Sequence, residues 1–254
     1  MIEKVLYQYQ LKDQKADIAR QFNIAGATLL YLGIEHTYDI NSETTKFILN
    51  NYEDFINQSG GSNVSIGIEG WMPPYDPKME DSDVIAKYGE QGLLAKIARE
   101  DDFNTMILGA DNKNLIKFVL CHYKLKLADI AEWVYLNQLK NILKPSSHQS
   151  TSFRFTADGI VTKMLKDFPT VDKSIYQNIN QTTVEAFSSK SAFSIPDDRY
   201  TYTGAIINRA LDQIIVTKLV EALSMGSNIF AVAGRDHINA ELPALIALEN
   251  PESV

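Results

Sequence analysis

The segment ATLLYLGIEH, Ala27–His36, decides the fold prediction. Its first eight residues form a short, continuous apolar run, which is typical of a strand buried on both faces of a parallel sheet. Gly33 is the second-last residue of this run, and His36 follows it after two further residues. A second apolar run, SNIFAVAG, ends at Gly234 and is followed at the same spacing by His237. Two predicted strands far apart in the chain therefore end in the same way.

Strands and helices alternate along the chain that follows this segment. Ser42 is a suitable N-cap for an amphipathic helix, which Gly60 and Gly61 would end. A strand is expected at 63–70, a helix at 89–102 and a third strand at 104–111. This alternation predicts βαβ units, and hence an α/β fold with a mostly parallel central sheet flanked by helices.

The middle of the chain has a different pattern. Residues 112–196 are predominantly helical in their spacing, with a Ser-rich break at 143–152, and are expected to form a helical insertion or cap. A long helix at 203–226 then precedes the strand at 227–234, and the closing helix is expected at 240–249. The prediction is a single α/β domain over residues 1–254 that carries this insertion.

The composition is that of an ordinary globular protein. Of 254 residues, 45% are hydrophobic and 22% charged, and the net charge of −8 argues against a general nucleic-acid or anionic-membrane surface. The single Cys121 excludes an internal disulfide and a cysteine metal cluster, and its apolar helical context predicts burial in a core. Without a classical signal peptide or a membrane span, the expected location is cytoplasmic, although secretion without such a signal would look the same.

Polar side chains follow four of the predicted strands. In a parallel sheet these strand ends meet at one edge, where ligands bind. We therefore expect His36, Glu69 and His237 to lie close together, with Asp111 joining them or instead capping the next helix. Glu35 could point into this site or away from it. No sequence typical of NAD-binding or P-loop proteins accompanies these residues.

The ordered set of motifs resembles the superfamily that joins TraB proteins, Tiki proteases, ChaN-like haem-binding proteins and erythromycin esterases. YLGIEHTYD resembles its first Gly-x-x-His motif, FAVAGRDHI its last, and VSIGIEGW its middle strand with the glutamate. GEQGLLAKIA followed by MILGAD is similar to a helix and an acid-ending strand of several branches. The helix before the last strand usually carries an arginine with a polar partner, for which Arg209 and Asp212 are the matches and Arg199 a competitor.

The resemblance covers 27–111 and 203 to the C-terminus, and it implies one of two activities. The TraB-type and Tiki branches imply a metal-dependent hydrolase acting on an ester or peptide bond, in which Arg209 would stabilise an oxyanion or bind an anionic group of a small-molecule or peptide substrate. The ChaN-like branch implies a carrier of haem or another small ligand, and His36 and Tyr38 are available as iron ligands.

Hydrolysis at neutral pH needs an activated water, which a base or a divalent metal can provide. Two imidazoles and a carboxylate suit Mn, Co, Zn or Fe, so His36, His237 and Glu69 are the predicted metal ligands, with Asp111 or Glu35 as base or supporting group. Without a metal, Glu69 or His36 would be the base, and His237 would hold the substrate or the developing charge.

Two further expectations concern neighbouring segments. Trp71 opens a Pro-rich stretch directly after the Glu69 strand, and this stretch could be a lid or specificity element, or a rigid surface turn. The helical middle region could bind a protein partner, in which case the chain would be a catalytically degenerate interaction protein.

Overall fold

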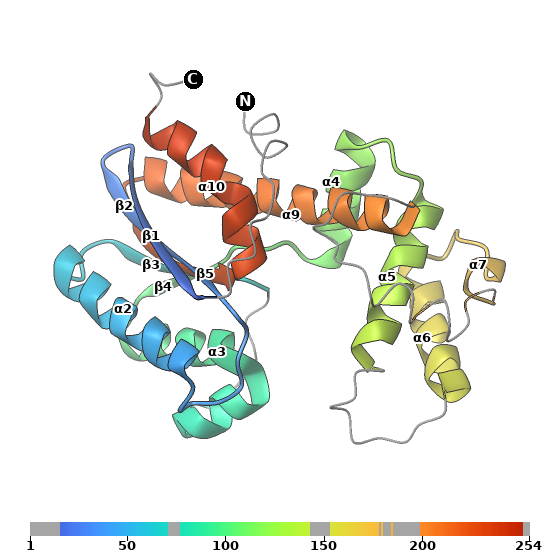
Figure 1. Ribbon diagram of the computed structural model, residues 1–254, viewed down its shortest axis with the longest axis horizontal. Helices are drawn as coiled ribbons and strands as arrows, with labels where there is room; N and C mark the ends of the chain where they lie inside the picture. The colour runs from blue at the N-terminus through green and yellow to red at the C-terminus, as the bar shows by residue number, and fades with distance from the viewer. Residues whose placement is uncertain are drawn as a thin grey trace. The chain divides into compact units, whose positions relative to one another are not determined.

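The computed structural model describes residues 16–70, 77–142, 153–177, 179, 184 and 199–250 (Figure 1). The chain divides into two compact units, which are described separately below. The first contains Met1–Asp111 and Leu211–Val254, and the second contains Asn112–Ala210. The long helix α9 (Arg199–Ser224) contributes residues to both.

The first unit is built on a five-stranded sheet with the order β1-β2-β5-β3-β4. The strands are β1 (Ile18–Ile24), β2 (Ala27–Ile34), β3 (Val64–Ile68), β4 (Asn104–Ile107) and β5 (Asn228–Gly234). β2, β5, β3 and β4 are parallel, and β1 is antiparallel to β2 at the edge. The predicted α/β fold with a mostly parallel sheet is confirmed, and β1 is an addition that the prediction lacked.

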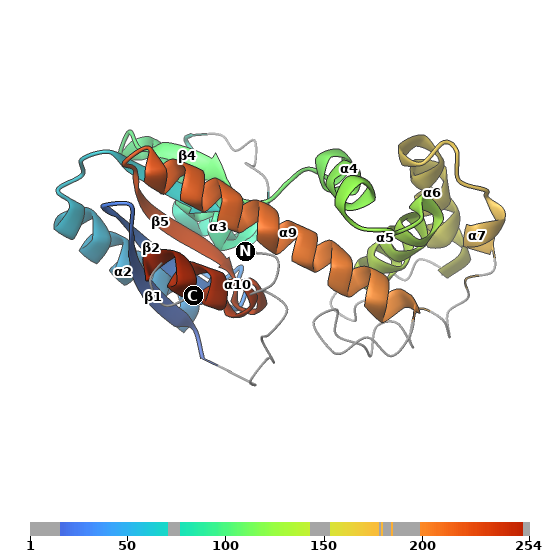
Figure 2. The same ribbon diagram turned by 90° about the horizontal axis from the view of Figure 1, so that it is seen from above.

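Helices cover both faces of this sheet, with α2 and α3 on one side and α9 and α10 on the other (Figures 1 and 2). Alternate residues of the central strands supply the two cores. Tyr31 and Ala231 face the α9 and α10 side, whereas Leu32 and Val232 face the α2 and α3 side. Because the central strands are buried on both faces, their side chains form the continuous apolar runs seen in the sequence.

The helices of the first unit are α2 (Glu43–Ser59), α3 (Asp81–Glu100), the second part of α9, and α10 (Arg235–Glu249). Ser42 caps α2 as predicted, since its side chain accepts a hydrogen bond from the Thr45 amide. α3 begins earlier than expected and is kinked at Gly89, whose φ of 71° lies in the left-handed region. α10 starts directly after Gly234 rather than at residue 240, so His237 lies in a first helical turn.

The second unit contains α4 (Asn112–His122), α5 (Leu127–Ile142), α6 (Phe153–Asp167), α7 (Ser174–Gln177) and the first part of α9. Its apolar core includes Ile206 and Ile207 of α9, which explains why the unit runs to Ala210 rather than to residue 196. The prediction that Cys121 is buried is wrong, because this residue lies on the exposed side of α4. In the described part of the chain, no helix has the length and apolar character required to cross a membrane.

Candidate functional site

His36, Glu69 and His237 lie together at the carboxyl edge of the sheet, as their positions after β2, β3 and β5 led us to expect. The carboxylate of Glu69 stands between the two imidazoles. Its Oε1 is 3.3 Å from His237 Nε2, and its Oε2 is 4.0 Å from His36 Nε2. Both rings therefore present the same nitrogen, Nε2, to one carboxylate.

His36 is held by a buried glutamate on the kinked helix α3. Its Nδ1 lies 2.7 Å from Glu90 Oε1, and the other oxygen of Glu90 accepts a hydrogen bond from the Thr37 amide. The Glu90 amide in turn donates to the Thr37 carbonyl. The positive φ of Gly89 turns the chain so that Glu90 meets this loop, and it explains why a Gly-Glu pair occurs inside α3. The His36 side chain itself is 48% exposed.

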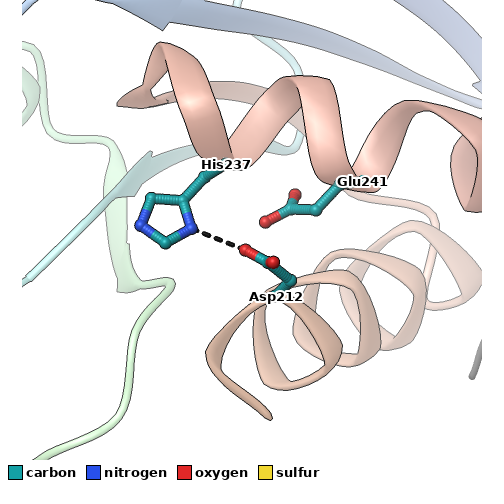
Figure 3. Close-up of side chains that lie close together, drawn as sticks. All are labelled: Asp212, His237 and Glu241. Carbon is teal, nitrogen blue, oxygen red and sulfur yellow. Dashed lines mark hydrogen bonds and ion pairs between the residues drawn. The ribbon is translucent and has the colours of Figure 1, made fainter. Parts of the chain in front are cut away.

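His237 is held in the same manner by Asp212 of α9. Figure 3 shows the imidazole of His237 directed from α10 towards this carboxylate, with Nδ1 at 2.5 Å from Oδ1. The pair is buried, since the side chains are 11% and 5% exposed. Each imidazole thus uses Nδ1 for a buried carboxylate and leaves Nε2 for Glu69, an arrangement that fixes ring orientation and tautomer.

Gly234 lies next to His36, Glu69 and His237. Its amide donates to Glu69 Oε2 at 2.5 Å. A Cβ at this position would lie 3.3 Å from His36 Nε2 and 3.4 Å from Glu69 Oε2. Because glycine has no side chain, space remains directly beside His36 Nε2 and Glu69 Oε2. Gly33, at the corresponding place on β2, lets α10 approach, because a Cβ there would overlap the side chain of Ile238.

The electrostatics of the cluster favour positive charge between its carboxylates. Burial by itself raises the pKa of Glu69, but contacts with His237 and the Gly234 amide outweigh it and lower the pKa to about 2. The hydrogen bond to Glu90 raises the pKa of His36 despite partial burial. For His237 burial acts to lower the pKa, yet Asp212 and Glu69 bring it well above its usual value. Protons on the two Nε2 atoms would remove the repulsion between the nitrogen lone pairs and the Glu69 carboxylate. A metal ion between these atoms would do the same.

Glu241 adds a second buried carboxyl group behind His237. It lies one turn further along α10 and is fully buried, and the Tyr31 hydroxyl and the Asp212 carboxyl are close enough to affect its pKa. Figure 3 shows it beside Asp212 and His237. Asp212, His237 and Glu241 each offer a ligand atom within 4.8 Å of the others, so this group could hold a metal ion. The hydroxyl of Tyr31 is also buried near Glu241.

Replacing Glu241 with Gln is expected to stabilise the metal-free protein above neutral pH. Burial raises the pKa of Glu241 well above 4.5, so above about pH 4.5 the unfolded chain releases a proton that the native state retains. The stability of the native protein therefore falls as the pH rises, and Gln removes this loss. We expect the variant to be more stable than the wild type at pH 8, with a gain that grows as the pH rises from about 4.5. Denaturant unfolding in EDTA measures it.

The gain of Glu241→Gln should shrink towards zero as the pH approaches 4, where the carboxyl is protonated in both states. Glu43→Gln is the matched control, since this side chain is 91% exposed and loses the same charge at the surface. A Glu241→Gln variant that is less stable than the wild type at pH 8 would show that the carboxylate is stabilised in the native state.

The other predicted site residues have different surroundings. Glu35 is 82% exposed, and its carboxylate lies 3.6 Å from Arg235 Nη2. Asp111 is exposed, and its negative charge opposes the lowering of the Lys218 pKa by burial. The Lys218 ammonium group donates a hydrogen bond to the Ile107 carbonyl at the end of β4. The predicted roles of Glu35 and Asp111 as base or supporting group beside Glu69 stay predictions.

Three further predictions stay predictions. Arg209 belongs to the second unit, so its expected contact with a substrate is not described. Trp71 lies outside the described residues, and the same is true of the side chain of Arg199. Tyr38, the possible haem ligand, is 65% exposed, and its ring lies against Gly89.

Sequence reasoning missed or undervalued the residues that hold the imidazoles. Glu90 belongs to the Gly-Glu motif of α3, but only the kink at Gly89 brings it to His36. Asp212 was noted only as a polar partner for an arginine. Glu241 had a signal in its spacing of four residues from His237, which would have been visible had α10 been expected to begin at Arg235.

Comparison with known proteins adds no name to this site. No protein-family model, curated protein or solved structure matches the chain.

Proposed function

We propose that this chain is a metal-dependent hydrolase that cleaves an ester or peptide bond, with one divalent ion held by His36, Glu69 and His237. One observation carries the proposal: the Glu69 carboxylate faces the Nε2 atoms of both imidazoles across the space that Gly234 leaves open. The resemblance of the two Gly-x-x-His motifs to TraB-type and Tiki sequences agrees with this proposal.

The donor set fits such an ion. Metal–ligand distances of about 2.0–2.2 Å place two ligand atoms of a tetrahedral site about 3.4 Å apart. The 3.3 Å between His237 Nε2 and Glu69 Oε1 agrees with this value. The 4.0 Å between His36 Nε2 and Glu69 Oε2 is longer, and His36 is the more exposed of the two rings. Metal-binding histidines usually donate their other nitrogen to a carboxylate, as both rings do here.

The alternative group of Asp212, His237 and Glu241 supports the ligands rather than competing with them. The 2.5 Å between His237 Nδ1 and Asp212 Oδ1 is a hydrogen-bond distance, shorter than two ligands of one ion require. Asp212 therefore orients His237, and its negative charge strengthens the imidazole as a ligand.

The charge balance also supports a cation. Glu69, Glu90, Asp212 and Glu241 are four carboxyl groups with little or no exposure, gathered around two imidazoles. Even with both imidazoles protonated, full ionisation of these groups would leave excess negative charge in a buried environment. A divalent ion, or protons on part of the group, compensates it.

In the proposed reaction the chain positions groups and controls charge. Glu90 and Asp212 hold the two Nδ1 hydrogens, so the lone pairs of both Nε2 atoms point to the centre. The Gly234 amide keeps Glu69 ionised and in place. A divalent ion held by His36, Glu69 and His237 would lower the pKa of water from about 15.7 towards about 7 and would so supply a nucleophile at neutral pH. The half-exposed His36 marks the side from which a substrate can enter.

The purified wild-type protein is expected to contain Mn, Co, Zn or Fe in metal analysis, or to bind added Mn²⁺ with release of protons from the imidazoles. It should hydrolyse members of a panel of chromogenic esters and fluorogenic peptides. EDTA should abolish this hydrolysis, and one of these metals should restore it. A metal-free protein that binds none of them and hydrolyses nothing would refute the proposal.

Two variants locate the ion. Mn²⁺ binding that is lost in His36→Ala and kept in Glu241→Gln supports the proposed ligands. The reverse result would place the ion among Asp212, His237 and Glu241 and would show that the proposed ligand set is wrong.

A further inference from the structure

Asp17, just before β1, joins three segments with one carboxylate. Its Oδ1 accepts hydrogen bonds from the Glu35 amide at 3.0 Å and from Arg235 Nη2 at 3.1 Å. Its Oδ2 accepts from the Thr44 hydroxyl at 2.6 Å. Asp17 thereby connects the loop after β2, the first turn of α2 and the first turn of α10.

Two of these segments carry the imidazoles of the site. Glu35 directly precedes His36, and Arg235 lies two residues before His237. The amide and the guanidinium meet at the same oxygen of Asp17, and Arg235 also lies 3.6 Å from the Glu35 carboxylate. The residues between Gly and His in the two motifs are therefore linked to each other.

The sheet does not supply this link. The pairing of β2 with β5 ends at Ile34 and Gly234. Beyond it one chain enters a loop and the other a helix, and each histidine then has its own buried carboxylate. Glu90 and Asp212 fix the direction of each ring, whereas Asp17 bridges the two segments where the ladder has ended. Asp17 and Arg235 are both 15% exposed, so their contact is well shielded from solvent.

We propose that Asp17 is a positioning residue that sets the separation of His36 and His237, and so the affinity of the site for a divalent cation. This inference rests on the proposed function. A purely structural role would lower stability alone, whereas a positioning role changes the geometry of the two rings in protein that is still folded.

The test compares Asp17→Ala, Asp17→Asn and Tyr52→Phe. Asn keeps an oxygen that can accept from Glu35 and Arg235. Tyr52→Phe is the control, because it removes a 2.7 Å hydrogen bond to Asp101 from α2, outside the cluster. Mn²⁺ affinity is measured by calorimetry below the melting temperature of every variant. We expect a loss of about tenfold or more for Asp17→Ala, as for supporting residues of metal sites, a smaller loss for Asp17→Asn and none for Tyr52→Phe.

A second measurement needs no metal. In the metal-free protein, the ¹H–¹⁵N signals of both imidazoles should shift in Asp17→Ala and stay in place in Tyr52→Phe. Wild-type affinity and unchanged imidazole signals in folded Asp17→Ala would overturn the inference. A wild-type protein that binds none of Mn²⁺, Co²⁺, Zn²⁺ and Fe²⁺ would instead refute the metal proposal, and the imidazole signals would still decide the role of Asp17.

Discussion

His36→Ala is expected to lower kcat/KM for ester or peptide hydrolysis about a thousandfold while the protein remains folded. The magnitude follows from the role: removing a positioned imidazole that activates water, directly or as a metal ligand, costs about two to four orders of magnitude. His36 is the better of the two histidines to test. It is 48% exposed, so its removal leaves the apolar core intact. His237→Ala should also abolish activity, but it leaves the buried Asp212 without its partner.

His122→Ala is the matched control for His36→Ala. It also removes an imidazole, from an exposed position on α4 in the second unit, where the ring lies 4.3 Å from that of Phe118. Circular dichroism and thermal melting check that both variants fold. Near-wild-type kcat/KM in folded His36→Ala would exclude His36 from the reaction, and an equal loss in His122→Ala would show that the effect is not specific to the site.

The central sheet could be predicted because its physical cause is visible in the sequence. A strand with helices on both faces needs apolar side chains throughout, and β2, β3 and β5 have them. β1 lies at the edge and has a mixed sequence, with Arg20 and Gln21 exposed, so it has no such run. The turn after β1 is a two-residue hairpin turn, in which Ala25 and Gly26 both have positive φ. Its Ala-Gly sequence predicts such a turn only weakly.

The candidate site could be predicted only in part. The sheet topology brings together any side chains that directly follow parallel strands, and this rule was enough for His36, Glu69 and His237. Glu90 and Asp212 come from the interior of helices, and they reach the imidazoles through the kink in α3 and the packing of α9 against the sheet. No local pattern encodes such tertiary placement, so these residues required the structure.

Gly234→Ala is expected to reduce hydrolysis and Mn²⁺ affinity by about a hundredfold or more with little effect on folding. Gly234 has φ −57° and ψ 141°, which Ala adopts without strain, and the weaker N-cap costs at most about 1 kcal/mol. The added methyl would lie 3.3 Å from His36 Nε2, 3.4 Å from Glu69 Oε2 and 3.7 Å from His237 Cδ2. The methyl occupies the space beside the nitrogen and oxygen atoms that face one another. A misplacement of reacting groups by about 1 Å lowers the reaction rate about a hundredfold.

Gly159→Ala makes the same change where a Cβ meets open space on the exposed side of α6. This control should leave activity and metal affinity unchanged. Gly234→Ala tests the space between the imidazoles without disturbing the residues that hold them. The Glu90–His36 and Asp212–His237 contacts involve other atoms and should persist. A variant that keeps both contacts by imidazole NMR but loses Mn²⁺ locates the ion in the space above Gly234. Full activity in folded Gly234→Ala would mean that neither the ion nor the reacting water uses that space, and the proposed site would be wrong.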